Sequence, residues 1–94
     1  MQIQFEQSDS KGAFFVEENE HHLATMTFSK AGDQLLIIDH TEVSDVLRGK
    51  NVGKQLVAAA VEHARKNNLK ILPLCPFAKS VFERVKEYQD VLDR

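Results

Sequence analysis

The chain has 94 residues, of which 43% are hydrophobic and 28% charged, and its formal net charge at pH 7 is −2. This length and composition predict one soluble domain over residues 1–94 and exclude a disordered chain or a membrane-spanning one. The small acidic excess excludes a general nucleic-acid binder, because such domains usually carry a basic excess or stripe.

The N-terminal stretch, MQIQFEQSDSKG, lacks the basic and then apolar pattern of a secretion signal. We therefore expect a cytoplasmic protein. The single cysteine, Cys75, excludes an internal disulfide, which agrees with a reducing compartment.

The first half of the chain carries the alternating pattern of β-strands. Residues 3–7 alternate apolar and polar side chains, as a half-buried strand does. Residues 12–30 predict a hairpin of two strands around a polar turn at residues 18–20. In its second strand we expect one face to carry four side chains: His22, Ala24, Met26 and Phe28.

A turn over residues 30–34 leads into residues 35–43, which we expect in the middle of the sheet. Their four consecutive apolar residues, LLII, are typical of a strand covered on both faces. From residue 52 apolar residues recur at helical spacing, which predicts a helix that ends near residues 67 and 68. Its apolar stripe consists of Val52, Leu56, Ala60 and Ala64, with Val57 and Val61 beside them.

Residues 69–74 predict a second buried strand, which should diverge or end at Pro73 because proline cannot donate a ladder hydrogen bond. The order strand, helix, strand predicts a right-handed parallel crossover. A last helix should follow Pro76, because Phe77, Val81, Phe82, Val85 and Tyr88 recur at helical spacing. We expect the three aromatic rings among these residues in the core. The pattern predicts an α+β fold of about five strands and two helices.

The stretch LRGKNVGKQLV, residues 47–57, places three cations around two glycines at the predicted helix start. A helix N-terminus usually attracts acidic residues, yet Arg48, Lys50 and Lys54 have no acid among them. Free N–H groups and cations together predict a site for a compact anion such as a pyrophosphate. The spacing does not match a P-loop, which needs Ser or Thr at the position that Gln55 occupies. It does not match the dinucleotide pattern GxGxxG either. A solvated basic turn is the alternative.

This loop follows the strand ending HTEV and resembles the acetyl-coenzyme A motif of the GNAT superfamily of N-acetyltransferases, Arg/Gln-x-x-Gly-x-Gly/Ala. Arg48, Val52 and Gly53 match the motif, and Asn51, which tolerates left-handed backbone geometry, replaces its first glycine. The whole chain is similar to very short GNAT-like proteins. The matching segments are His40-Thr41, Val43, Leu47-Arg48-Gly49, Cys75-Pro76-Phe77, Phe82 and EYQDVL.

The resemblance implies an acetyl-coenzyme A-dependent N-acetyltransferase with a mixed, mostly antiparallel sheet, a central helix in a βαβ crossover and a C-terminal helix. It also implies that the end of the central strand pairs with the pantetheine arm and that the helix start takes the pyrophosphate. Residues 79 and 80, one turn after Cys75, are further candidates, although a solvated helix face is the alternative. The expected cofactor-binding residues are Glu42, Val43, Arg48, Gly49, Lys50, Asn51, Val52, Gly53, Lys54, Lys79 and Ser80.

Two residues are candidates for catalysis. Cys75 precedes Pro76 and is predicted to cap the last helix, a position that favours the thiolate. It could accept the acetyl group as a nucleophile or protonate the departing coenzyme A thiolate; a buried thiol that only fills space is the alternative. His40, at the end of the central strand, is a candidate base on the amine, or else a histidine bonded to backbone. The other histidines show no metal-ligand spacing with Cys75, and we expect no metal.

Two functions stay open at this point: an enzyme that acetylates an amine, and a non-catalytic coenzyme A-binding module that senses acyl or redox state through Cys75. Larger GNAT domains place about two helices between the first two strands, where this chain has only residues 8–11. We therefore expect an open acceptor side, suited to a peptide or protein amine or completed by another subunit. We expect no nucleic-acid or membrane partner.

Overall fold

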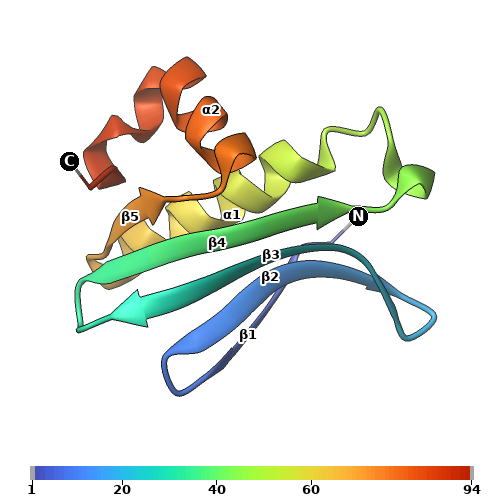
Figure 1. The fold of residues 1–94 in the computed structure, drawn as a ribbon, viewed down its shortest axis with the longest axis horizontal. Helices are drawn as coiled ribbons and strands as arrows, with labels where there is room; N and C mark the ends of the chain where they lie inside the picture. Colours follow the sequence, from blue (N-terminus) through green and yellow to red (C-terminus); the bar gives the residue numbers. More distant parts are fainter. Residues whose placement is uncertain (1, 94) are drawn as a thin grey trace.

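The computed structural model describes residues 2–93, and its centre is a five-stranded sheet (Figure 1). The strands cross the sheet in chain order: β1 (Gln4–Ser8), β2 (Lys11–Glu18), β3 (His21–Ala31), β4 (Leu35–Val43) and β5 (Lys70–Pro73). The neighbours from β1 to β4 are antiparallel, whereas β4 and β5 are parallel. The predicted α+β fold with a mixed, mostly antiparallel sheet and a parallel crossover is confirmed.

Two α-helices pack on one face of this sheet. α1 (Val52–Asn67) connects β4 to β5, and α2 (Pro76–Arg84) follows β5. Short 3₁₀ segments precede α1 and follow α2: η1 (Asp45–Leu47) and η2 (Lys86–Val91). Figure 1 shows α1 along the sheet and α2 beside it, next to β5. None of the helices within residues 2–93 is long and apolar enough to span a membrane.

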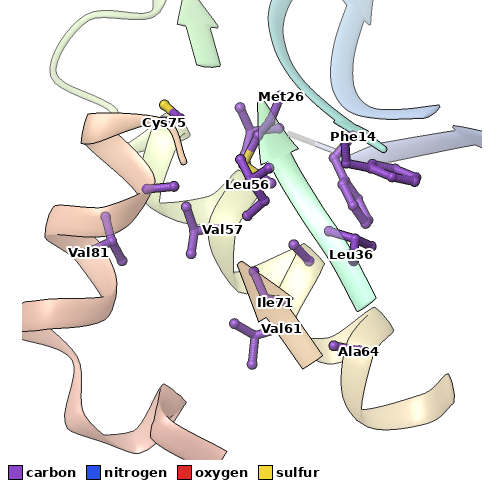
Figure 2. Close-up of a cluster of buried hydrophobic side chains, with 14 of the residues drawn as sticks. Phe14, Met26, Leu36, Leu56, Val57, Val61, Ala64, Ile71, Cys75 and Val81 are labelled. Atoms are coloured by element: carbon purple, nitrogen blue, oxygen red, sulfur yellow. The ribbon is translucent and has the colours of Figure 1, made fainter. Parts of the chain in front are cut away.

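The core lies between the sheet and the two helices. The predicted apolar stripe of α1 is buried along its whole length, as expected from its helical spacing. Its side chains pack with those of Met26, Leu36 and Ile71 from the sheet and Val81 from α2 (Figure 2). One contiguous cluster therefore joins both helices to the sheet.

A β-bulge in the hairpin of β2 and β3 changes which side chains reach this core. The register shifts between Val16 and Glu17 and leaves Leu23 as an extra residue in β3. Such an insertion reverses the alternation of faces along the strand. His22 therefore lies on the outer face, stacked on Phe15 with ring centroids 4.4 Å apart. The prediction that His22 shares the core face of β3 is wrong.

The predicted cover on both faces of β4 is also wrong. Leu36 and Ile38 are fully buried, but Leu35 and Ile37 on the outer face are only partly buried. The reason is that both described α-helices pack on the same side. The aromatic prediction for the C-terminal part is wrong for one ring, because Phe77 is exposed while Phe82 is buried.

Arg65, on α1, connects this helix to η2 through hydrogen bonds. Its guanidinium donates hydrogen bonds to both carboxylate oxygens of Asp90, at 2.9 and 3.0 Å, and to the Glu87 carbonyl at 2.8 Å. The pKa of Asp90 lies below its ordinary value, mainly because Arg65 donates a hydrogen bond to its carboxylate.

We expect wild-type stability to fall more steeply on acidification below about pH 4 than the stability of an Arg65→Gln variant. An aspartate whose folded pKa lies below its unfolded pKa stabilises the fold above the unfolded value, and this contribution is lost as the pH falls through the folded value. Urea unfolding at pH 7 and pH 3 measures the difference. Arg84→Gln is the matched control, since the one hydrogen bond that the Arg84 side chain makes within residues 2–93 is a long one, 3.4 Å, to a carbonyl of its own helix. Equal pH dependence in all three proteins would contradict this role of Asp90.

Candidate functional site

β4 and β5 separate halfway along β4. Their parallel ladder ends at the pair Ile38 and Pro73. The Ile38 carbonyl then accepts hydrogen bonds from the amides of Leu74 and Cys75, at 3.1 and 3.3 Å. The chain continues from there into α2, so the second half of β4, up to Val43, has a free edge within the described part of the chain.

A second bulge decides which side chains of this free half face the helices. The register between β3 and β4 shifts and leaves Asp39 as an extra residue in β4. Thr41 is paired with the buried Met26 and faces the helices, whereas His40 is exposed and faces outward. Cys75 contacts Thr41, so His40 and Cys75 lie on opposite faces of the sheet.

A pocket of about 420 Å³ lies between the free half of β4, the start of α1 and the start of α2. Most of the residues predicted for the anion site line it, together with apolar residues from β4 and α2. The lining residues are Thr41, Val43, Leu47, Arg48, Gly49, Asn51, Val52, Gly53, Lys54 and Phe77.

The start of α1 presents uncapped amides to this pocket. Asn51 stands at the N-cap in the left-handed region (φ 58°, ψ 32°), and its side chain does not cap the helix. The amides of the first three helical residues, 52–54, have no acceptor within the helix. The first turn holds no acidic residue, and Lys54 adds a positive charge. This arrangement favours an anion at the helix start.

Arg48 is already paired with a neighbouring acid. Its guanidinium donates to the Asp45 carboxylate at 2.8 Å, and both side chains are more than four-fifths exposed. The prediction that this loop binds an anion therefore rests on Lys54 and the helix amides more than on Arg48. An exposed pair of this kind contributes little to stability, so Arg48 can exchange its partner easily.

Four predicted binding residues do not line the pocket. Glu42 and Lys50 are exposed beside it. Lys79 lines a separate pocket of about 450 Å³ between β5, α2 and η2. Ser80 donates its hydroxyl to the Phe77 carbonyl of its own helix, at 2.7 Å.

Cys75 is the N-cap of α2, with Pro76 at the first helical position, as its sequence context predicts. The thiol is 6% exposed, and its Sγ lies 3.3 Å from the Thr41 hydroxyl oxygen. Burial raises the pKa of Cys75, but hydrogen bonding from Thr41 and from the amides of Ala78, Phe77 and Thr41 outweighs it, so the pKa lies below the ordinary value. The local structure therefore favours the thiolate.

The Phe77 ring leaves no room for a side chain at position 53, so glycine is required there. A Cβ atom added to Gly53 would lie 2.6 Å from the Phe77 ring, although Phe77 itself is 36% exposed. The ring therefore packs closely against the backbone of α1 at Gly53, and Phe77 is one of the residues that line the pocket. No pattern in the sequence predicts this contact, although both residues lie in the motifs that carry the family resemblance.

We expect the effect of Gly53→Ala on stability to change sign with the residue at position 77. In the wild type the added methyl group forces the ring to move, and overpacking of this kind costs about 1–3 kcal/mol. In a Phe77→Ala background the same change should stabilise the protein by about 0.5–1 kcal/mol, because alanine favours a helix over glycine. A double-mutant cycle by urea unfolding measures both values. Equal effects in the two backgrounds would show that the ring does not constrain position 53.

Comparison with known proteins shows the family to which the chain belongs. Residues 13–91 match the family model described as GCN5-related N-acetyl-transferase. The protein NATD1 of Gallus gallus is 31% identical over 74 residues, which cover 78% of this chain and 67% of NATD1.

Solved structures show the same fold. A GCN5-like protein of Staphylococcus aureus, solved by NMR, is 44% identical with a TM-score of 0.71, over 96% of this chain and 87% of that one. AAC(6')-Iy, solved with the bisubstrate analogue CoA-S-monomethyl-acetylneamine, is 12% identical with a TM-score of 0.55, over 93% of this chain and 65% of that one. The chain belongs to the family of GCN5-related N-acetyltransferases, enzymes that take the acetyl group from acetyl-coenzyme A.

Proposed function

We propose that this chain acetylates an amine, with acetyl-coenzyme A bound as the donor substrate between the end of β4 and the start of α1. One observation carries the proposal: a single pocket combines uncapped helix amides, a free strand edge and a lining hydroxyl that contacts a thiol. The donor supplies an acetyl thioester, a pantetheine arm with amide groups and a diphosphate. Each of these groups has a chemically matching partner in the pocket.

The diphosphate fits the start of α1. The three free amides of residues 52–54 converge there, with Gly49 and Asn51 in left-handed geometry forming the turn that exposes them. Arg48 and Lys54 add charge at the pocket wall, and Lys50 adds charge nearby. Hydrogen bonds to charged groups contribute about 1.5–3 kcal/mol each, so several of them would supply much of the about 8 kcal/mol that micromolar binding needs.

The pantetheine arm fits the free edge of β4. The Ser44 amide donates to the Leu23 carbonyl of β3 at 2.7 Å. In an antiparallel ladder this bond directs the backbone groups of Glu42 toward β3 and those of Val43 toward the other side. By the same alternation the backbone of Thr41 also faces the free edge. We therefore propose Thr41 and Val43, rather than Glu42, as the strand residues that pair with the arm.

Cys75 has one of two roles in the proposed reaction. As a nucleophile, its thiolate bonds to the acetyl carbon and displaces the donor's thiolate; an amine then takes the acetyl group and frees the Cys75 thiolate. As an acid, its thiol instead gives a proton to the donor sulfur while the amine attacks directly. The lowered pKa of Cys75 favours the first role, because the attacking species is the thiolate.

The acceptor amine has an open approach from the outer face of the sheet. The donor pocket lies on the helix side, and no helix within residues 2–93 covers the other side. His40 is exposed on that outer face, next to Thr41 in the strand and beside the point where β4 and β5 separate. We propose that His40 takes the proton from an ammonium acceptor that approaches there.

Radiolabelled acetyl-coenzyme A tests the proposal. The protein is incubated with it alone, and then with peptides that carry free α- or ε-amino groups. Label on a peptide supports the enzyme, and label on Cys75 without acceptor supports the nucleophile. Donor binding by calorimetry with no label anywhere would contradict turnover and leave a binding module. In the same assay His40→Asn should slow transfer to the peptide without slowing the labelling of Cys75.

A further inference from the structure

We propose that Thr41 is a positioning residue for Cys75, whose hydroxyl holds the sulfur beside the pocket and donates a hydrogen bond to the thiolate. The inference deepens the proposed function and rests on it for its effect on transfer. The contact itself belongs to the protein alone. It can therefore be tested in the absence of donor and acceptor.

β4 holds Cys75 at two points. The Ile38 carbonyl accepts from the Cys75 amide at 3.3 Å, and the Thr41 hydroxyl lies 3.3 Å from the Cys75 sulfur. The extra residue Asp39 lies between these two points of β4 and turns Thr41 toward the helices. Without the bulge, strict alternation would place the Thr41 hydroxyl on the outer face, away from Cys75. The bulge therefore brings the hydroxyl to the sulfur.

The hydroxyl suits both protonation states of the sulfur. The neutral thiol donates to the Thr41 oxygen, and after deprotonation the Thr41 hydroxyl donates to the sulfur instead. The second bond is the stronger one, because its acceptor is charged. Thr41 thereby favours the thiolate over the thiol.

Within the described residues no charged side chain stabilises the Cys75 thiolate. From β4, His40 and Glu42 flank Thr41 but face outward. From α2, the groups at the sulfur are the amides of Phe77 and Ala78, while Lys79 lines the other pocket. From α1, Lys54 lines the donor pocket, and no hydrogen bond within the described residues joins it to Cys75. The hydroxyl of Thr41 is thus the one side chain within residues 2–93 that hydrogen-bonds the sulfur.

Alkylation of the single cysteine measures the effect directly. The rate of reaction with iodoacetamide is followed from pH 5 to pH 10 in the wild type, Thr41→Val and Thr41→Ser. We expect the midpoint to rise by about one pH unit in Thr41→Val and to stay near the wild-type value in Thr41→Ser, which keeps the hydroxyl. Thr25→Val, on the outer face of β3, is the matched control and should not move the midpoint.

Two results would overturn the inference. One is the same midpoint in the wild type and Thr41→Val; the other is an equal shift in Thr41→Val and Thr41→Ser, which would assign the effect to packing. Circular dichroism checks the fold, and Thr41→Ala replaces Thr41→Val if the valine variant does not fold. A shifted midpoint in a protein that transfers no acetyl group would count against the proposed function alone. Transfer without any shift would count against Thr41 alone.

Discussion

Replacing Cys75 by alanine lowers the rate of acetyl transfer by about 100- to 10,000-fold, the range that a lost acid, base or nucleophile gives. Donor binding should be retained, because Cys75 lies beside the pocket and is not one of the residues that line it. The alanine fits the small buried site of the thiol, so the fold should be kept. Steady-state kinetics with a labelled donor and a peptide amine measures the loss, and calorimetry measures the binding.

The matched variant Cys75→Ser separates the two roles of the thiol. A serine hydroxyl is a much weaker nucleophile and a weaker acid, so transfer stays low in both cases. Intact-protein mass spectrometry, without acceptor, distinguishes them: an acetylated wild type and an unmodified serine variant indicate a nucleophile. Full activity of Cys75→Ala would reduce the thiol to a packing residue.

The double variant Arg48→Glu/Lys54→Glu reverses the charge at the helix start. It should raise the dissociation constant of acetyl-coenzyme A by about 100-fold or more. The variant replaces two charge-assisted contacts, worth roughly a factor of ten or more each, by repulsion of the diphosphate. Titration calorimetry at low and physiological salt measures the change. The wild type should lose affinity with salt more steeply than the variant.

Two further variants make this test specific. Lys11→Glu/Lys66→Glu changes the net charge equally, at positions outside the pocket, and should leave the dissociation constant nearly unchanged. Asp45→Asn removes the acid that pairs with Arg48 and should therefore tighten donor binding. Equal losses in both double variants would show that net charge and not the helix start governs affinity. Weaker binding in Asp45→Asn would show that Arg48 does not bind the donor once its acid partner is removed.

The pattern of apolar residues along the chain correctly predicted the helices and strands whose position depends only on their own buried face. The helix predicted from residue 52 to near residues 67 and 68 matches α1, because its apolar stripe repeats at helical spacing, and the strand predicted over residues 35–43 matches β4, which begins with four apolar residues. The N-cap at Cys75 followed from a local rule, proline at the first helical position. Such features need only neighbours in sequence, and the sequence therefore predicts them well.

The two bulges could not be predicted in the same way. Leu23 and Asp39 are extra residues only with respect to a partner strand, and no residue type in the chain marks them. Each reverses the faces of the residues beyond it, which is why His22 lies outside and why Thr41, not His40, meets Cys75. The pairing of Phe77 with Gly53 has the same character, since it joins two helices through tertiary contact.

The bare outer face of the sheet has a consequence for selectivity. Many enzymes close a lid over their substrate, and the opening of that lid often limits turnover. Residues 2–93 place no such cover over the outer face near His40. Discrimination between amines would then depend on the contacts that the incoming molecule makes with that uncovered face, and product could leave without a slow conformational step.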